Sequence, residues 1–189
     1  MKEIVNLLFE ARMLKRTPRS GYQFLGVGEE SVAEHSFMTA FIGLIMARMR
    51  PDADALRLVS MCLIHDLAEA RTGDLNYVQK KYVSADASKA LEDALNDVWF
   101  GKRLAELIQE FDAGDSMEAA LARDADQLAL ILELKFLTDL GFEPPKQWMR
   151  NVAGRIQTTT GKDLFENIQH ADPAAWWRKN YIDNPPKNK

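Results

Sequence analysis

A short stretch of the chain brings together side chains that bind metals and transfer protons. His65 and Asp66 are adjacent, Glu69 follows them by one helical turn, and Asp74 comes just after Gly73. Residues three and four apart share one face of a helix, so the first three side chains would be neighbours, and a loop beginning at Gly73 could return over them. A buried aspartate is costly unless it is paired or bound to a cation, so the cluster favours a metal site. Taken singly, Glu69 and Asp74 are as consistent with a solvated helix end as with a functional site.

His35 begins a stripe of apolar residues at steps of three and four. The stripe continues through Met38, Ile42, Ile45 and Met49. This spacing keeps them on one helical face, so His35 is expected to point inward. By itself, such a histidine is more often a core residue with a satisfied hydrogen bond than a metal ligand. The third histidine, His170, lies outside the motifs and is expected at the surface. With three histidines in the chain, any metal must also take carboxylates.

A further carboxylate could come from the predicted helix that follows Ser116. Asp124 and Asp126 both lie there among leucines and alanines. Periodicity does not decide which of the two points inward, and a lone aspartate in such a helix is usually solvated. Spacing alone therefore makes neither of them a ligand.

The elements that must position these residues are helices throughout. Ser31 and Glu34 form a capping-box signature at the start of the helix that carries His35, and Asp52 or Asp54 can cap the next helix, which runs toward His65. We predict loops over 19–30 and 71–83. Helical periodicity covers residues 2–16, 84–99, 101–112, 116–140, 145–157, 161–169 and 172–182. The sequence predicts an all-α, single-domain helical bundle over residues 1–183, with a flexible C-terminal tail over 184–189.

Composition narrows the class of protein. The 189 residues are 47% hydrophobic and 28% charged, which is typical of a globular domain. No apolar run is long enough to span a bilayer, and a single cysteine, Cys62, excludes an internal disulfide and a cysteine-rich zinc site. The net charge of -4 gives no support to nucleic-acid binding. We expect a cytoplasmic protein that uses neither a membrane nor a nucleic acid as partner.

Taken in order, these motifs resemble the HD-domain metal-dependent phosphohydrolases. The resemblance rests on His35, on the pair His65-Asp66 and on Asp126 in the run 124–128. Three longer matches, over residues 14–22, 31–36 and 65–74, are similar to the branch that contains 5'-deoxynucleotidases and the HD-domain-containing protein 2 group. The His-Asp dipeptide is nonspecific, whereas the four-part order with HDxxE and TGD is specific. The resemblance covers most of the chain and implies an HD-type helical fold.

The resemblance also implies a metal centre. Residues that match His35, His65, Asp66 and Asp126 hold one divalent ion in that family, which favours Asp126 over Asp124. Two imidazoles and two carboxylates suit Mn²⁺, Co²⁺, Fe²⁺, Ni²⁺ or Zn²⁺ and leave room for water and a substrate oxygen.

Three further roles follow from the same resemblance. Glu69 matches a catalytic glutamate that handles a proton, Arg16 matches an arginine that orients the phosphate, and Asp74 matches a contact to the sugar. Arg16 without the resemblance would be taken as a surface charge. Bacterial members have a tryptophan after that arginine, where this chain has Thr17, and Asn76-Tyr77 also departs from their pattern.

The leading hypothesis is a metal-dependent 5'-nucleotidase that converts nucleoside 5'-monophosphates to nucleoside and phosphate, with a preference for deoxy substrates. A homodimer is implied by the resemblance alone. One alternative is an HD-type phosphohydrolase that acts on a cyclic nucleotide, a nucleoside triphosphate or another small phosphoester. A second is a metal-bound regulatory domain without turnover, which the presence of Glu69 disfavours because a structural site needs no proton-transfer group.

Overall fold

The computed structural model describes residues 1–183, and every regular element in that range is a helix, which confirms the predicted fold class. One isolated antiparallel bridge pairs Pro18 with Ser31. The tail predicted over 184–189 lies outside the described residues.

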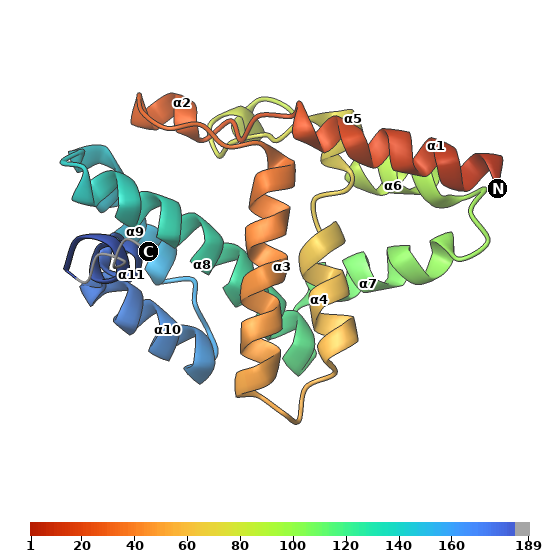
Figure 1. Cartoon of the computed structure of the whole chain (residues 1–189). Helices are drawn as coiled ribbons and strands as arrows, with labels where there is room; N and C mark the ends of the chain where they lie inside the picture. The colour runs from red at the N-terminus through yellow and green to blue at the C-terminus, as the bar shows by residue number, and fades with distance from the viewer. Residues whose placement is uncertain (184–189) are drawn as a thin grey trace, which may run out of the picture.

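Three helices form the centre of the molecule, namely α3 (Val32–Met49), α4 (Ala55–Ile64) and α8 (Met117–Asp139) (Figure 1). Their buried apolar side chains, including Met46, Leu58 and Leu128, form the main hydrophobic core. Burial of this apolar surface is the main force that holds the three helices together.

Shorter helices cover the two sides of this centre. On one side, α9 (Glu143–Ala153) and α10 (Thr159–His170) pack against α8. On the other side lie α1 (Lys2–Ala11), α6 (Ala87–Leu95) and α7 (Gly101–Ala113), over a second apolar cluster (Figure 1). The second cluster includes Leu14, Val32 and Ile108, so it joins the N-terminal segment to the start of α3.

Side-chain caps fix where the central helices begin. The Ser31 hydroxyl accepts from the Glu34 N–H at 3.2 Å, and Glu34 Oε2 accepts from the Ser31 N–H at 2.7 Å, so the predicted capping box is present. Asp54 caps α4 by accepting from the Arg57 N–H, which decides between the two candidates. Since the box sets the first turn of α3, it also sets the direction of His35.

Several predicted boundaries differ from the structure. The helix predicted over 2–16 changes after α1 into a 3-10 helix, Arg12–Lys15, and the loop predicted over 19–30 contains the short helix α2 (Tyr22–Leu25). A 3-10 turn, Gln79–Lys81, interrupts the second predicted loop. The last predicted helix is divided into α11 (Ala175–Arg178) and a π-helical segment, Lys179–Asp183.

The apolar stripe on α3 is inward only in its first half. His35 is fully buried, but Ile45 and Met49 are exposed by more than a third. The buried side instead continues through Thr39 and Met46. At about 100° per residue, Ile45 lies roughly 80° from His35 around the helix and so falls off the buried face, whereas Met49 lies roughly 40° away, like Thr39, and is exposed as the last residue of the helix.

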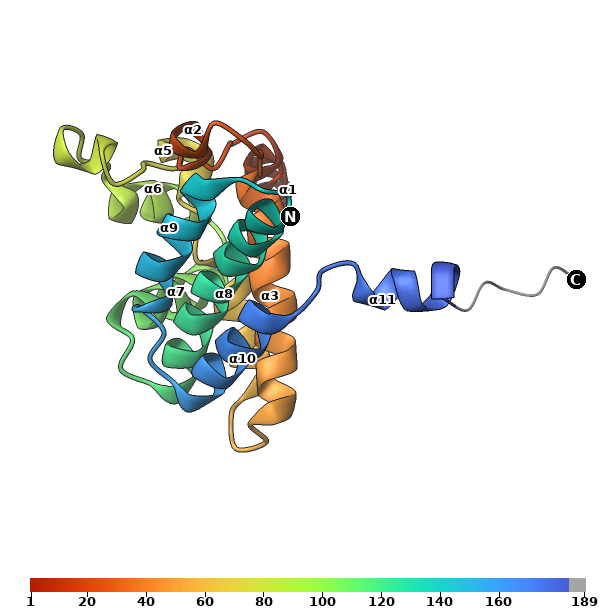
Figure 2. The same ribbon diagram turned by 90° about the vertical axis from the view of Figure 1, so that its left-hand side faces the viewer.

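The C-terminal helix leaves the body of the molecule. Figure 2 shows α11 projecting away from the other helices, on the side where α3 is exposed. None of the helices within residues 1–183 combines the length and the apolarity needed to cross a membrane.

Candidate active site

The His65-Asp66 pair lies just beyond the C-terminal end of α4, not on a continuous helix as predicted. The Leu67 N–H donates to the Ile64 carbonyl and the Glu69 N–H donates to the Asp66 carbonyl, both at 3.0 Å, and the next helix, α5 (Glu69–Thr72), is short. Hydrogen bonds between residues three apart make a tighter turn, in which side chains three apart are aligned. Asp66 and Glu69 accordingly line the same cavity.

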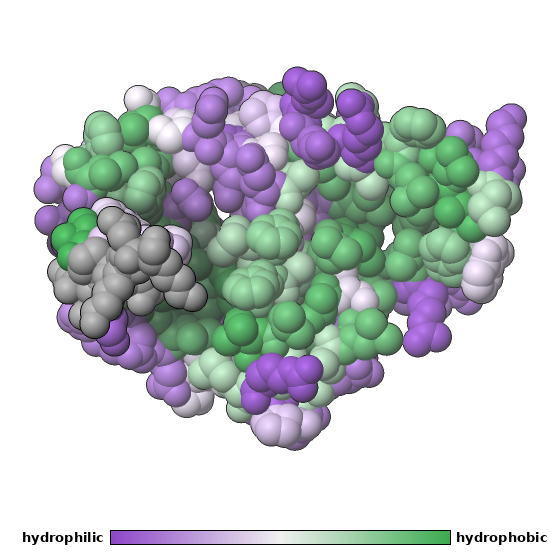
Figure 3. All heavy atoms as spheres, in the orientation of Figure 1, coloured by the Kyte–Doolittle hydropathy of each residue, from purple (hydrophilic) through white to green (hydrophobic). Residues whose placement is uncertain are grey.

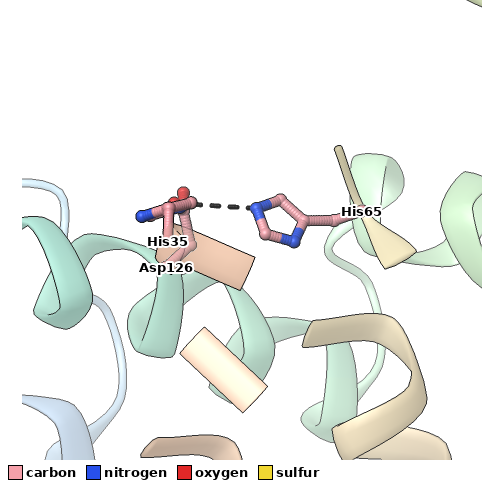
Figure 4. A group of neighbouring side chains, drawn as sticks. All are labelled: His35, His65 and Asp126. Atoms are coloured by element: carbon pink, nitrogen blue, oxygen red, sulfur yellow. Dashed lines mark hydrogen bonds and ion pairs between the residues drawn. The ribbon is translucent and has the colours of Figure 1, made fainter. Parts of the chain in front are cut away.

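One hydrogen bond orients the His65 imidazole. Its Nδ1 lies 2.9 Å from the Cys62 carbonyl oxygen, which can only accept, so Nδ1 donates this bond and Nε2 is the ring nitrogen left to bind a cation. Nε2 is buried without a hydrogen-bond partner among the described residues. Figure 4 shows this ring directed toward Asp126. A buried nitrogen lone pair that faces a carboxylate is suited to bind a cation.

His35 reaches the same point from α3. Its Nε2 lies 2.8 Å from Asp126 Oδ1 and 3.4 Å from the Thr39 hydroxyl. On the other side of the ring, Nδ1 lies 3.9 Å from Glu30 Oε2, in a buried carboxylate that also accepts a hydrogen bond from the Tyr22 hydroxyl. The ring therefore lies between two carboxylates: Asp126 is within hydrogen-bonding distance of Nε2, whereas Glu30 is beyond that distance from Nδ1, which has no hydrogen-bond partner among the described residues.

The structure separates the two aspartates of α8. Asp124 is buried but faces away from the histidines, because its carboxylate accepts hydrogen bonds from the Gln157 and Thr158 N–H groups at 2.8 Å and from the Thr158 hydroxyl. It therefore anchors the start of α10. Asp126 faces the histidines, and its second oxygen accepts from the Gln127 side chain at 2.6 Å.

The donor atoms are spaced as ligands of a single ion. One ligand atom each from His35, His65 and Asp126 lies within 4.8 Å of the others. Asp66 Oδ2 lies 3.2 Å from His65 Nε2 and 4.0 Å from His35 Nε2. Atoms about 2.1 Å from one ion are roughly 3.0 Å apart at right angles and about 4.2 Å apart when opposite. His35, His65 and Asp126 could hold a divalent metal, with Asp66 Oδ2 close to both histidines, and the unpartnered His65 nitrogen supports that fit.

The cluster has a surplus of negative charge. Burial alone lowers the pKa of His65, but the Asp66 and Asp126 carboxylates outweigh it and raise that pKa to about 9. Burial raises the pKa of Asp126, yet its hydrogen bond to His35 and the nearby charges lower it overall. Both shifts show that the surroundings stabilise a positive charge between these side chains.

Glu69 differs from the other acids. Burial, reinforced by the charges of Asp66 and Asp74, raises the pKa of Glu69 to about 8. Its Oε2 is buried and has no hydrogen-bond partner within residues 1–183. Without a cation nearby, Glu69 holds a proton at neutral pH, and a divalent ion beside it would lower the pKa again.

A cavity of about 290 Å³ opens over this cluster. Its walls include Asp66, Glu69 and Asp126, together with Asp74 from the loop after α5. Gly73 has a φ of 71°, a left-handed conformation that favours glycine and turns the chain back over the site. Asp74 Oδ2 accepts from the Ser20 N–H at 2.7 Å and from the Ser20 hydroxyl at 3.3 Å, which ties this loop to the N-terminal segment.

Two arginines line this cavity, Arg155 and, in contact with Asp66, Arg19. The Nη1 atom of Arg19 lies 3.4 Å from Asp66 Oδ2, and the Arg19 backbone N–H donates to the Glu30 carbonyl at 2.8 Å. Arg16 is exposed at the end of the first 3-10 helix and is not among the residues that line the cavity. The structure therefore does not bring Arg16 to the other predicted site residues.

Sequence reasoning also missed Glu30 and Gln127. Glu30 lies 3.9 Å from His35 through tertiary packing and belongs to no motif that pointed to chemistry. Gln127 is the sequence neighbour of Asp126 inside the matched run 124–128, but that match assigned no role to it. The sequence contained one indication that Arg19 could belong to the site, because Arg19 lies inside the first matched stretch, residues 14–22. His170 is exposed, as predicted, and pairs with Glu166 at 3.2 Å.

Comparison with known proteins agrees with the family that the sequence motifs resemble. The family model described as HD domain matches residues 11–169. The human protein 5'-deoxynucleotidase HDDC2 is 29% identical over 172 residues, which cover 85% of this chain and 78% of that protein. The mouse protein of the same name is 30% identical over 160 residues, which cover 79% of this chain and 74% of that protein.

Solved structures share the arrangement of helices. A conserved hypothetical protein from Pyrococcus furiosus has a TM-score of 0.76 at 27% identity, covering 88% of this chain and 99% of its own. A predicted metal-dependent phosphohydrolase from Magnetospirillum magnetotacticum shares the fold, with a TM-score of 0.69 at 20% identity. The match covers 88% of this chain and 89% of that protein. Because the family model spans most of the chain, this protein belongs to the HD-domain family of metal-dependent phosphohydrolases.

Proposed function

We propose that this protein is a metal-dependent 5'-nucleotidase that hydrolyses nucleoside 5'-monophosphates, with a preference for deoxy substrates. The observation that carries the proposal is the cavity in which Asp66, Asp126, Glu69 and Arg19 meet. It places a cation site, a proton-transfer group and a phosphate-binding side chain together. The similarity to 5'-deoxynucleotidases supports the substrate class.

The metal ligands in this proposal are His35, His65, Asp66 and Asp126. A mixed set of imidazoles and carboxylates suits Mn²⁺, Co²⁺, Fe²⁺, Ni²⁺ or Zn²⁺. When bound, the ion supplies a Lewis acid for the phosphate and lowers the pKa of a water molecule. Asp126 is kept in position by its hydrogen bond from Gln127, and His65 by its hydrogen bond to Cys62.

Glu69 carries the proton in this reaction. Its buried Oε2 faces no protein donor or acceptor among the described residues, so that atom is free to act on water or on the leaving 5'-oxygen. Asp74 accepts a hydrogen bond from the sugar. Ser20 holds Asp74 Oδ2, which leaves Oδ1 for a 3'-hydroxyl.

We assign the phosphate contact to Arg19 and expect it to matter more than Arg16. Arg19→Ala should lower kcat/KM by about 10- to 150-fold, because a hydrogen bond to a charged group contributes about 1.5–3 kcal/mol. Arg16→Ala is the matched control and should stay within about twofold of wild type. Steady-state kinetics with metal content measured for each variant makes the comparison. A larger loss in the Arg16 variant would return the role to Arg16.

The test of the function is a screen of metals against substrates. Purified protein stripped of metal is given each candidate ion, and each deoxynucleoside monophosphate is paired with its ribonucleotide. Orthophosphate release that requires a metal supports the proposal. Release of triphosphate, or opening of a cyclic nucleotide, would identify the other type of HD phosphohydrolase, and metal binding without any turnover would identify a regulatory domain.

We also propose that the protein is a homodimer. The face shown in Figure 3 carries a broad hydrophobic surface over α3 and α4. The exposed apolar side chains of α3 include Phe37, Phe41 and Leu44, and α11 projects from the side of the molecule on which α3 lies (Figure 2). Large exposed apolar patches mark interaction sites.

Light scattering after size exclusion should give twice the chain mass of 21.4 kDa for the wild type. Phe41→Glu should shift the protein toward monomer, because a charge would be buried in the interface. Glu29→Gln, at an exposed polar position in the loop before α3, is the control. A monomeric wild type would contradict the dimer.

A further inference from the structure

The cavity over the metal cluster also has apolar walls that the reaction at phosphorus does not use. Tyr77, Trp148, Leu25 and Leu130 line it together with the acids and Arg19. They come from four places in the chain: the loop after α5, helix α9, helix α2 and helix α8. Pockets for organic ligands combine apolar walls with a few placed polar groups in this way.

Three consecutive residues show how the subsites are ordered. Arg19 contacts Asp66 of the metal cluster, and Ser20 hydrogen-bonds to Asp74. Gly21 lies against Trp148, because a Cβ on Gly21 would be 2.5 Å from Cη2 of the indole. Successive Cα atoms are about 3.8 Å apart, so the chain passes the cluster, the acid and the indole in quick succession.

This order matches the order of groups in a nucleotide. The phosphate, the sugar and the base would lie in turn beside Arg19, Asp74 and Trp148. We propose that the Trp148 indole is the surface on which the nucleobase stacks, with Tyr77 as a second aromatic contact. This inference rests on the proposed nucleotidase function and names the part of the substrate that these side chains recognise.

The two aromatic rings are held in different ways. Trp148 is half-buried. It packs against the main hydrophobic core and also lines the cavity. Tyr77 is 60% exposed and contacts Phe24, with ring centroids 5.3 Å apart. A core-packed ring and an exposed ring at one cavity could contact a base from two sides.

Position 17 is a threonine in this chain and provides no aromatic ring. The Thr17 hydroxyl donates to the Met13 carbonyl at 3.2 Å and so belongs to the turn after the first 3-10 helix. The aromatic side chains that line this cavity are Trp148, Tyr77 and Tyr22, and of these Tyr22 is buried and donates a hydrogen bond to Glu30.

The first experiment compares a substrate with and without a base. Steady-state phosphate release is measured for deoxyadenosine 5'-monophosphate and for 2-deoxyribose 5-phosphate. Trp148→Ala should raise KM for the nucleotide by about 10- to 100-fold, in line with the usual contribution of base stacking, and leave KM for the sugar phosphate within about twofold. Trp148→Phe should recover most of the loss, because it keeps an aromatic face.

The matched control is Trp99→Ala. Trp99 is 86% exposed, contacts Phe100 and does not line the cavity, so both substrates should behave as in wild type. Equal losses on both substrates in Trp148→Ala would mean that the indole only supports the fold, and this would overturn the inference. So would an unchanged KM for the nucleotide.

A second experiment keeps the inference separate from catalysis. Calorimetry in EDTA measures binding of deoxyadenosine 5'-monophosphate without turnover. Binding that weakens about tenfold or more in Trp148→Ala, and not in Trp99→Ala, supports the base site even if no phosphate is ever released and the nucleotidase proposal fails. No binding by the wild type, or equal binding by the Trp148 variant, would overturn it.

Discussion

Replacement of Asp66 by alanine is expected to remove the divalent metal and to abolish phosphate release. Asp66 Oδ2 lies 3.2 Å from His65 Nε2, and its charge is one of those that raise the pKa of His65. Without that carboxylate, the site keeps two imidazoles and Asp126 and loses half of its negative ligand charge. Metal affinity should fall by more than about 100-fold, since loss of even an outer partner of a ligand costs 10- to 100-fold.

Two measurements check this expectation. Metal content after dialysis gives the occupancy, and circular dichroism shows whether the variant remains folded. Asp115→Ala, at an exposed position before α8, is the control and should keep both metal and activity. A folded Asp66→Ala protein with full metal content would remove Asp66 from the ligand set.

Glu69→Gln should have the second largest effect and a different signature. The amide has nearly the same shape as the acid but cannot exchange a proton, so kcat should fall by about 10² to 10⁴, the usual contribution of an acid-base group. Metal content should stay unchanged, because Glu69 is proposed to act beside the ion without binding it.

Glu133→Gln is a suitable control. Glu133 is also half-buried, and burial raises its pKa, but it does not line the cavity. Its variant should keep wild-type turnover. If Glu69→Gln lost its metal as well as its turnover, Glu69 would be a ligand, and if it kept full turnover, the proton would have to be carried by another group.

The order of helices could be predicted from the sequence because helices are built from local contacts. The Ser31-Glu34 capping box and the Asp54 cap join residues three apart, and both are present in the structure. The C-terminal end of α4 was harder to predict. His65, Asp66 and Glu69 have spacings that suit a helix, but hydrogen bonds between residues three apart replace the helical pattern there.

Periodicity on α3 was reliable near His35 and failed toward the C-terminal end of the helix. Apolar residues such as Ile45 occur where no other helix of the described chain covers them. Periodicity shows which residues share a face, but it does not show how far a neighbouring helix extends along that face. The same exposed residues support the proposed dimer.

By itself, the sequence determined an all-helical chain with His35, His65, Asp66 and Glu69 at positions where a metal and a proton could be handled. Spacing left open which of the other polar residues join them; the family resemblance favoured Asp126, and only the tertiary structure decided the partner of each residue. Asp124 and Asp126 are two residues apart on one helix, yet Asp124 accepts hydrogen bonds from the segment that leads into α10 whereas Asp126 meets His35. Arg16 and Arg19 share one short segment, and only Arg19 enters the cavity. The physical reason is that a side chain's partner comes from packing between distant segments, and local spacing carries no record of that packing.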